Sequence, residues 1–281
     1  MKIFKTIPEI KNHLKELKKE GFSIGFVPTM GALHQGHISL IRKACLGNDK
    51  VVCSIFVNPI QFTNKDDLLK YPRKIDSDFQ MLRENNCDIL FFPDTKEMYP
   101  EVEDAIYDFG HLDNILEGKF RPGHFNGVAI VVKKFLEIIE PDKAYFGKKD
   151  YQQLAVIKAL VKNFNIPVEI IPCPTFREDD GLAMSSRNLR LSENERSIAP
   201  HIHKVLLQAK TKAATITAEE LKVWVISEFS KYHEFKLEYF ELADPDTLLP
   251  VKSLKKGQNC MALIAVYLGN IRLIDNIEIF Y

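Results

Sequence analysis

The sequence has no excess of charge of either sign, since 38 lysines and arginines balance 38 aspartates and glutamates among 281 residues. A protein that holds nucleic acid or a membrane surface through its overall charge needs a broad basic excess, so we expect neither as a partner. Hydrophobic residues make up 46% of the chain, which is enough to bury a sizeable core. The composition is that of an ordinary globular protein with one large domain or two moderate ones.

Cysteine is scarce, and the five cysteines are scattered without a C-x-x-C pair. This spacing argues against a disulfide scaffold or a zinc knuckle, and we interpret the cysteines as small buried apolar residues. Lysines interrupt the apolar residues of positions 1–13, which is unlike a signal peptide. The longest apolar-rich stretch, Cys260–Leu268, is about half of the roughly 20 residues that cross a membrane. We therefore expect a cytoplasmic protein.

The signatures of several large enzyme classes are also missing. The sequence contains no G-x-G-x-x-G, no G-x-x-x-x-G-K-[ST], no G-x-S-x-G and no H-E-x-x-H. Dinucleotide binding of the common kind, P-loop hydrolysis, serine hydrolysis and zinc proteolysis all lose support as a result.

What the sequence does contain is an alternation of strand-like and helix-like segments over about the first 175 residues. Short apolar runs predict strands at 22–27, 51–57, 89–92, 144–146 and 168–171, and helical stretches lie between them at 37–46, 76–85, 128–139 and 151–164. The runs 51–57 and 168–171 lack strict alternation, which is typical of strands buried on both faces. Alternating strands and helices predict a parallel sheet with right-handed crossovers.

After about residue 176 the pattern changes. Helical stretches at 193–212 and 218–233 are followed by strand-like runs at 236–242, 260–268 and 271–280. Gly269 and Asn270 fit a two-residue hairpin loop between the last two runs. The sequence thus predicts an α/β domain over 1–176 and a smaller α+β domain with an antiparallel sheet over 177–281.

The loop at 28–37 is the richest in chemistry. Ligands of an open parallel sheet bind beyond the carboxyl ends of its strands, where such a loop lies. Its two glycines permit close backbone approach, and His34 and His37 share one face of a helix start. The unpaired N–H groups and the positive end of a helix suit phosphate. A metal site or two structural histidines remain open as alternatives, although no third metal ligand is evident nearby.

Two further loops carry positive charge. Lys148 and Lys149 precede a predicted helix for which Asp150 is a good N-cap, a placement that makes sense beside an anion, with solvated surface lysines as the alternative. The segment 177–188 puts serines beside Arg187, which together can bind phosphate, and a mobile loop there could close over a ligand. A polar linker that caps the next helix is the competing interpretation.

Two quieter segments complete the set. Asn58–Phe62 follows a predicted buried strand and offers amides beside apolar surface, which suits a small polar substrate. Leu116–Asn126 is rich in turn formers and carries Arg121 and His124.

Six sequence blocks follow one another along the chain: PTMGALHQGH at 28–37, FVNPIQF at 56–62, YPR at 71–73, RPGHFNGV at 121–128, FGKKDYQQ at 146–153 and GLAMSSRN at 181–188. Together they resemble the pantothenate synthetase (pantoate–β-alanine ligase) family, a nucleotidyltransferase group with a His-x-Gly-His motif that is related to class I aminoacyl-tRNA synthetases. Lys148 is a departure, since relatives often carry an acidic or amide residue there. The resemblance implies a Rossmann-like nucleotide-binding domain and a smaller domain that closes over the site.

The resemblance also implies roles for individual residues. An ATP site would be lined by Met30, Gly31, Ala32, Leu33, His34, Gln35, Gly36, His37, Gly147, Lys148, Lys149, Asp150, Phe176, Met184, Ser185, Ser186 and Arg187. Four of these would act in catalysis, with His37 as the proton donor beside His34, Lys149 and Arg187. Gln61 and Gln153 would bind pantoate, and Gln61 would also lie near β-alanine. The metal ligands stay open.

The family reaction converts ATP, pantoate and β-alanine into pantothenate, AMP and pyrophosphate, with Mg²⁺, in a cytosolic homodimer that serves coenzyme A synthesis. The pantoate carboxylate would attack the α-phosphorus of ATP, and the amine of β-alanine would then attack the pantoyl-adenylate. Charge develops on phosphate in the first step, which imidazole, ammonium and guanidinium groups stabilise without any protein nucleophile. Two other functions stay open, an adenylyltransferase that joins ATP to a phosphate ester and a catalytically silent nucleotide-binding module.

Overall fold

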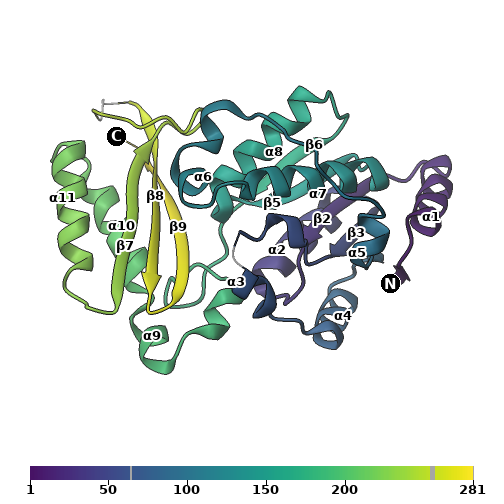
Figure 1. Ribbon diagram of the computed structural model, residues 1–281, viewed down its shortest axis with the longest axis horizontal. Coiled ribbons are helices and arrows are strands. Elements are labelled where there is room, and N and C mark those ends of the chain that lie inside the picture. Colours follow the sequence, from purple (N-terminus) through teal and green to yellow (C-terminus); the bar gives the residue numbers. More distant parts are fainter. Residues whose placement is uncertain (64, 254–256, 281) are drawn as a thin grey trace. The chain divides into compact units, whose positions relative to one another are not determined.

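The chain forms two compact units in the computed structural model, which describes residues 1–63, 65–253 and 257–280 (Figure 1). The first unit comprises residues 1–148 and 152–174, and the second comprises residues 149–151 and the chain from 175 onward. The second unit therefore takes a three-residue segment from the middle of the first.

The first unit is built on a six-stranded sheet. Its strands are β1 (Lys2–Phe4), β2 (Ile24–Thr29), β3 (Lys50–Ile55), β4 (Ile89–Phe91), β5 (Lys143–Gly147) and β6 (Glu169–Cys173). They lie in the order β1-β4-β3-β2-β5-β6, and every neighbouring pair is parallel. The predicted Rossmann-like α/β fold is confirmed.

The longer helices of this unit cover both faces of the sheet. They are α1 (Ile7–Lys19), α2 (Gln35–Gly47), α4 (Ile75–Glu84), α7 (His124–Ile139) and α8 (Tyr151–Asn163). With right-handed crossovers, the direction in which the chain steps across the sheet sets the face on which the helix lies. The chain steps in one direction across the sheet from β2 to β3 and from β3 to β4, and these crossovers contain α2 and α4. It steps in the opposite direction from β1 to β2, from β4 to β5 and from β5 to β6, and these crossovers contain α1, α7 and α8. Accordingly α2 packs on α4, and α1 packs on α7.

Alternate residues of the central strands fill a core on each face. The core under α2 and α4 includes Val27, Cys53, Leu90, Ile41 and Leu82. On the opposite face, the ring centroid of Phe135 on α7 lies 5.7 Å from that of Phe26 and 6.1 Å from that of Phe91. β3 is buried from Val51 to Ile55, as predicted for a strand between two cores.

The first 19 residues hold a strand and a helix that the sequence analysis did not include. The helix α1 is amphipathic, and its Ile10, Leu14 and Leu17 are buried at spacings of four and three. That spacing was a readable signal. β1 is only three residues long at the edge of the sheet, which is too short to produce a periodicity.

Two strand predictions need correction. The strand predicted at 22–27 is β2 at Ile24–Thr29, because this stretch pairs residue by residue with β3. The run at 168–171 belongs to β6, but its interpretation as a strand buried on both faces is wrong. β6 is an edge strand in which only Cys173 is buried. An edge strand also tolerates Pro172, which has no N–H for a second ladder.

From residue 175 onward, the described part of the second unit contains helical segments followed by strands. These are η4 (Ser186–Arg190), α9 (Glu193–Ile198), α10 (His201–Lys212), α11 (Ala218–Phe229), β7 (Phe235–Ala243), β8 (Asn259–Leu268) and β9 (Ile271–Phe280). The strands form an antiparallel sheet in chain order, with α10 packed against β9 and α11 against β7 (Figure 1). Gly269 and Asn270 form the predicted two-residue loop, with Gly269 at φ +55°.

The helix boundaries of this unit differ from prediction. The stretch at 193–212 is two helices rather than one, because Pro200 lacks the N–H that would continue α9 and instead starts α10. The helix predicted to reach residue 233 ends at Phe229. The α+β class of the segment is nevertheless confirmed.

Short helical segments fill the remaining connections. They are η1 (Pro59–Gln61), α3 (Lys65–Leu69), α5 (Thr95–Met98), η2 (Gly110–Asp113), α6 (Leu116–Phe120) and η3 (Lys148–Asp150). Within the described ranges, we find no helix whose length and apolar character would let it cross a membrane.

The five cysteines are free thiols, four of them buried and Cys45 half-buried. Burial raises the pKa of Cys87 to about 12 and that of Cys260 to about 11. The reactive thiolate form is therefore disfavoured at these positions, in keeping with their interpretation as packing residues.

Candidate active site

β2 lies at the point where the strand order of the sheet reverses. From β2 the chain passes through α2 to β3 on one side, whereas β5 flanks β2 on the other side. Open parallel sheets bind ligands at such a point, in the crevice beyond the carboxyl ends of the two strands. The segments that leave these ends begin at Met30 and at Lys148. The topology therefore starts two of the predicted ATP-binding loops at one edge of the sheet.

The loop between β2 and α2 has an unusual backbone that a carboxylate holds in place. Gly31 and Ala32 have positive φ values of +80° and +48°. The N–H groups of Ala32 and Leu33 donate to the two carboxylate oxygens of Asp78 on α4, at 2.8 and 2.7 Å. Gly31 has little room for a side chain, since a Cβ there would lie 3.1 Å from both Asp78 Oδ2 and Ile55 Cγ2.

Asp78 is a residue that the sequence analysis missed. Its side chain is buried, and burial raises the pKa of its carboxyl group above the ordinary value, although the two backbone donors partly oppose this shift. The available signal was its position four residues before Leu82, on the buried face of α4. An acidic residue on an apolar helix face needs a partner, and here the partner is the loop.

His34 and His37 cap α2 with their rings. His34 is the N-cap residue, and its Nδ1 accepts a hydrogen bond from the N–H of Gly36 at 3.1 Å. His37 Nδ1 in turn accepts from the N–H of His34 at 3.3 Å, and the two ring centroids are 4.0 Å apart. A ring nitrogen that accepts carries no proton, so the neutral rings carry their protons on Nε2. The predicted common face of the two histidines at a helix start is confirmed.

The amino-terminal end of α2 combines two kinds of donor. Its first turn contains no acidic residue, so nothing in that turn offsets the positive end of the helix dipole. The Nε2–H groups of His34 and His37 add donors beside the helix N–H groups. This combination suits an anion such as phosphate.

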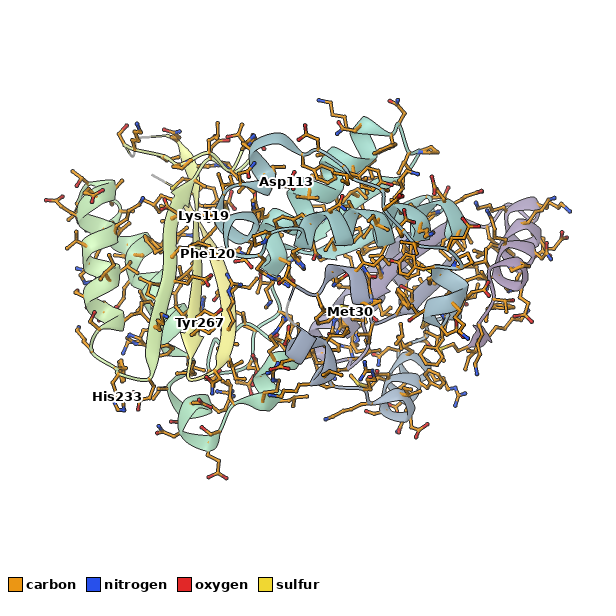
Figure 2. All side chains as sticks on the ribbon, viewed as in Figure 1. Met30, Asp113, Lys119, Phe120, His233 and Tyr267 are labelled. Atoms are coloured by element: carbon orange, nitrogen blue, oxygen red, sulfur yellow. The ribbon has the colours of Figure 1, made fainter. Side chains whose placement is uncertain are left out.

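Asn58 and Gln61 form a buried pair of amides beyond the end of β3. Asn58 Nδ2 donates to Gln61 Oε1 at 3.2 Å and to the carbonyl of Gly127 at 3.0 Å. The amide nitrogen of Gln61 also lies 2.9 Å from the sulfur of Met30, a residue labelled in Figure 2. A Cβ on Gly127 would lie 2.6 Å from Gln61 Cα, so only glycine allows α7 to approach η1 this closely. The structure thus brings Gln61 against the predicted ATP-binding loop.

His124 contacts the backbone of η1, whereas Arg121 lies beside a glutamate of α6. His124 is buried, and its Nδ1 lies 2.7 Å from the carbonyl oxygen of Gln61. Arg121 Nη1 lies 3.9 Å from a carboxylate oxygen of Glu117. His124 therefore fixes the backbone of the residue predicted to bind pantoate.

Gln152 and Gln153 are neighbours with different environments. Gln152 is buried, accepts from the N–H of Glu117 and donates to the carbonyls of Leu112 and Ile115. Gln153 is half-buried, and its side-chain amide has no hydrogen bond to the residues that the structure describes. Gln152 is thus a structural residue, whereas the amide of Gln153 stays available to a ligand.

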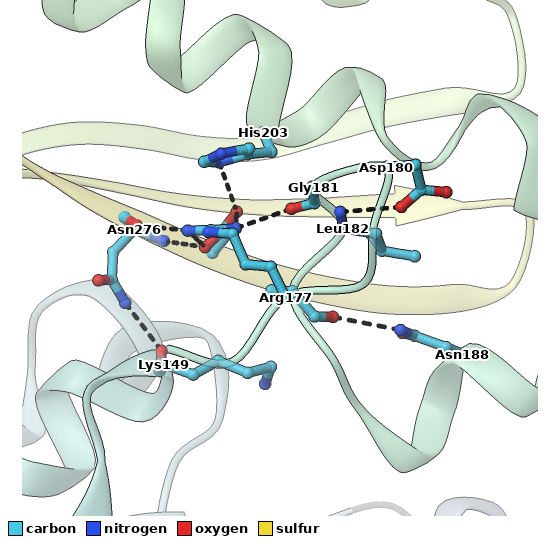
Figure 3. A network of polar contacts seen from close by, with 10 residues as sticks. Lys149, Arg177, Asp180, Gly181, Leu182, Asn188, His203 and Asn276 are labelled. Atoms are coloured by element: carbon cyan, nitrogen blue, oxygen red, sulfur yellow. Dashed lines mark hydrogen bonds and ion pairs between the residues drawn. The ribbon is translucent and has the colours of Figure 1, made fainter. Parts of the chain in front are cut away.

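Lys149 belongs to the second unit. Its Nζ lies 3.6 Å from Asp150 Oδ1, and its side chain is 17% exposed. Its carbonyl oxygen accepts a hydrogen bond from Nδ2 of Asn276 at 2.9 Å (Figure 3). The backbone of this predicted catalytic residue is therefore held by a side chain from β9.

The other predicted residues of the second unit lie on or beside a small hairpin. The N–H of Met184 donates to the carbonyl of Phe176 at 3.0 Å, and Arg177 forms an antiparallel bridge with Ala183. Ser185 then caps η4, since its hydroxyl accepts from the N–H of Arg187 at 3.2 Å. The segment is thus a hydrogen-bonded turn that presents Met184–Arg187 directly after it.

The predicted site residues divide between the two units. The first unit contains Met30–His37, Gly147, Lys148, Gln61 and Gln153, and the second contains Lys149, Asp150, Phe176 and Met184–Arg187. Within the first unit the structure joins Met30 to Gln61 and His34 to His37. In the second it joins Phe176 to Met184 and Ser185 to Arg187.

A protein-built metal cage does not form among the described residues, where no three His, Cys, Asp or Glu side chains converge. The Nδ1 atoms of His34 and His37 are also taken by backbone N–H groups. The geometry therefore gives no support to a metal site at these histidines.

The parallel sheet, the helix end with two histidines at its reversal point and the adjacent buried amides define a class of protein, an α/β enzyme that binds a nucleotide without a P-loop. Comparison with known proteins narrows this class. The family model for pantoate-beta-alanine ligase matches residues 2–278. The chain belongs to the pantoate–β-alanine ligase family.

The chain is similar in sequence to individual relatives along nearly the whole length of each protein. The chain is 46% identical to pantothenate synthetase from Porphyromonas gingivalis over 278 residues, which cover 99% of each protein. It is 48% identical to pantothenate synthetase from Cytophaga hutchinsonii over 276 residues, or 98% of each. The predicted family and enzyme class are confirmed.

Solved structures are also similar. Pantothenate synthetase from Thermus thermophilus superimposes with a TM-score of 0.93 at 39% identity, with all of each chain covered. The pantoate-beta-alanine ligase from Francisella tularensis, solved as a complex with beta-gamma ATP and beta-alanine, gives a TM-score of 0.83 at 42% identity and covers 99% of this chain and 97% of its own.

Proposed function

We propose that the chain condenses pantoate with β-alanine at the expense of ATP, giving pantothenate, AMP and pyrophosphate through a pantoyl-adenylate. The observation that carries this proposal is the match to the ligase family over residues 2–278. The Francisella tularensis relative was solved with beta-gamma ATP and beta-alanine, which supports ATP and β-alanine as ligands here. The paired histidines at the amino end of α2 supply the matching chemistry.

In the first step the pantoate carboxylate attacks the α-phosphorus, and the bond to pyrophosphate breaks. Negative charge then grows on the phosphate oxygens and on the leaving group. We assign the stabilisation of this charge to Nε2–H of His34 and His37, the ammonium of Lys149 and the guanidinium of Arg187. His37 would also give a proton to the leaving group.

Pantoate would be oriented by amides. Gln153 has no partner among the described residues, and Gln61 has its backbone fixed by His124 and its amide beside Met30. A hydroxy acid with a carboxylate needs several donors and acceptors at fixed positions, which two amides provide. Gln61 would also contact β-alanine, whose amine attacks the acyl carbon in the second step and releases AMP.

We propose that ATP binds residues of both units. The β2–α2 loop and Lys148 would hold it from the first unit, and Lys149, Asp150, Phe176 and Met184–Arg187 from the second. Closure of the domain that follows residue 176 would exclude water, because an acyl-adenylate hydrolyses when water reaches it.

Mg²⁺ would enter with the nucleotide. The described residues form no cluster of three metal ligands, and Mg²⁺ commonly relies on substrate phosphates and water with only one or two carboxylates. When bound, the ion neutralises charge on the phosphate oxygens. We further propose a cytoplasmic homodimer, and the five free thiols are consistent with a reducing compartment.

The proposal is tested by isotope exchange between pyrophosphate and ATP without β-alanine. Adenylation of pantoate predicts exchange that requires pantoate and Mg²⁺ and stops when pantoate is omitted. A panel of other carboxylic acids and phosphate esters separates this ligase from another adenylyltransferase. Exchange supported by a phosphate ester instead of pantoate would contradict the proposal, as would ATP binding with no exchange under any condition.

A further inference from the structure

Two consecutive residues of β9 hold two segments of the second unit that are far away in the sequence. Asp275 binds the side chain of Arg177, which begins the 177–188 segment, and Asn276 binds the backbone of Lys149 (Figure 3). Both segments carry residues that we assign to ATP. The strand therefore links them through one pair of side chains.

The Arg177–Asp275 pair is a two-pronged ion pair. Nη1 and Nη2 of Arg177 donate to the two carboxylate oxygens of Asp275 at 2.7 and 2.9 Å. The Asp275 side chain is 2% exposed, and His203 Nδ1 lies 3.8 Å from it. Arg177 also donates to the carbonyl of Gly181 at 3.1 Å, so the ion pair fixes the turn of the hairpin.

The backbone of Asn276 is satisfied without its side chain. Its N–H donates to Asp275 Oδ1 at 2.7 Å, and its carbonyl accepts from Arg177 Nη2 at 3.3 Å. These contacts cover the backbone at the outer strand of the sheet, as an edge strand requires. These contacts account for Asp275 and Arg177 as structural residues, and none of them involves the side-chain amide of Asn276.

The side-chain amide of Asn276 instead reaches η3. Asn276 is buried, and its Nδ2 donates to the carbonyl of Lys149 at 2.9 Å. Lys149 sits in the three-residue segment that the second unit takes from the first. Its long side chain has four rotatable bonds, so the place of its ammonium group depends on where its backbone is held.

We propose that Asn276 is a positioning residue for Lys149 in adenylate formation. The hydrogen bond to the Lys149 carbonyl fixes the origin of the lysine side chain relative to the hairpin that presents Met184–Arg187. Misplacing a charge-stabilising group by about an ångström is costly to a phosphoryl-transfer step, whereas substrate binding elsewhere is unaffected. This inference rests on the role of Lys149 in the proposed function.

A double-mutant cycle tests the coupling. The rate measured is pantoate-dependent exchange of pyrophosphate with ATP, which reports the first step alone. Asn276→Ala is expected to lower the exchange kcat about tenfold with little change in the KM for pantoate. In a Lys149→Ala background the same substitution is expected to change kcat less than about twofold, because the group it positions is gone.

Two further variants make the cycle decisive. Asn276→Asp keeps the volume of the side chain but removes the donor, and it should show the same background-dependent loss even if the alanine variant folds poorly. Asn85→Ala is the matched control, since it removes an amide that donates to the carbonyl of Met81 at 2.9 Å on α4. It should leave the exchange rate unchanged.

The outcomes separate the inference from the function on which it rests. Equal losses in both backgrounds, or a lower melting temperature with unchanged kcat, would overturn the positioning role alone. Unchanged exchange by Lys149→Ala would remove the role of Lys149 and the inference with it. A wild-type chain without pantoate-dependent exchange would overturn the proposed function itself.

Discussion

Two of the segments proposed to hold ATP are fixed by different means. The β2–α2 loop is shaped by its own backbone, with positive φ at Gly31 and Ala32 and two N–H groups on Asp78. The hairpin after Phe176 is held by a guanidinium on a carboxylate 98 residues away. Asp78, which anchors the β2–α2 loop, accepts hydrogen bonds from neutral N–H groups. Asp275, which anchors the hairpin, pairs with a charged guanidinium.

This difference predicts how each anchor responds to neutralisation. When a buried carboxylate that meets only N–H groups becomes an amide, the desolvation cost of its charge disappears, but one N–H group then faces the new NH2 donor instead of an acceptor. A buried carboxylate that meets a guanidinium leaves an uncompensated charge when it is neutralised. The two units can therefore be compared directly, because one loop is held by backbone N–H groups and the other by an ion pair.

The largest effect is expected from removing one charge-stabilising group in each unit. His37→Ala in the first and Lys149→Ala in the second should each lower kcat by roughly 10²–10³-fold, the usual scale for one electrostatic donor. Steady-state formation of AMP measures this. Lys158→Ala, on the exposed side of α8, is the control. Near-normal turnover by either folded variant would show that the substituted residue takes no part in the chemistry.

The next effect compares the two anchors by the same substitution. Asp275→Asn should lower the free energy of unfolding by about 2–3 kcal/mol, because Arg177 loses a charged partner. Asp78→Asn should cost less, about 1 kcal/mol, because one backbone N–H loses its acceptor while the burial that raises the pKa of this carboxyl group no longer penalises a charge. Denaturant unfolding of both variants measures the difference. Equal losses would erase the distinction drawn between the anchors.

A smaller effect sharpens the account of the β2–α2 loop. Gly31→Ala should cost about 1–3 kcal/mol and raise the KM for ATP, because it combines positive φ with two contacts at 3.1 Å. Gly110→Ala is the matched control, with φ +63° and no atom within 4 Å of an added Cβ. The Gly110→Ala control should show only the loss of stability that comes from the positive φ. A similar KM for ATP in both variants would contradict the special role of Gly31.

The smallest effect concerns acid stability in the second unit. Burial lowers the pKa of His201, and burial with nearby Arg177 lowers that of His203, from the ordinary 6.5. The folded chain then binds fewer protons than the unfolded chain, so this stability is complete above pH 6.5 and is lost as the pH falls below it.

A variant isolates the contribution of His201, whose ring lies among Phe229, Tyr232 and Phe235. Between about pH 7.5 and about pH 5.5, the melting temperature of His201→Phe should fall less than that of the wild-type protein. Melting curves at the two pH values measure this. An identical acid-induced loss in both proteins would contradict the assignment.

The sequence predicted most of the fold because hydrophobic periodicity is local. The central strands, the long helices and the β8–β9 loop at Gly269 all follow from patterns within about ten residues. The helix α1 was missed although its spacing is also local, whereas the wrong interpretation of β6 lies where tertiary context decides. β6 reads as apolar in the sequence, but its place at the edge of the sheet leaves it half-exposed.

The site was predictable where a motif is contiguous. His34 and His37 fall three apart, and the structure places them as reciprocal caps. The anchors were not predictable in this way, because Asp78 acts on a loop 45 and 46 residues away and Asn276 on a carbonyl 127 residues away. A single sequence contains no signal that pairs such residues.

The overall reaction assigned to the chain is that of an adenylate-forming ligase with pantothenate as its product. It is tested most directly by mass spectrometry of the products after incubation with ATP, Mg²⁺, pantoate and β-alanine. Pantothenate and AMP are expected in equal amounts, and neither product is expected when pantoate is left out. ADP in place of AMP, or AMP without pantothenate, would contradict it.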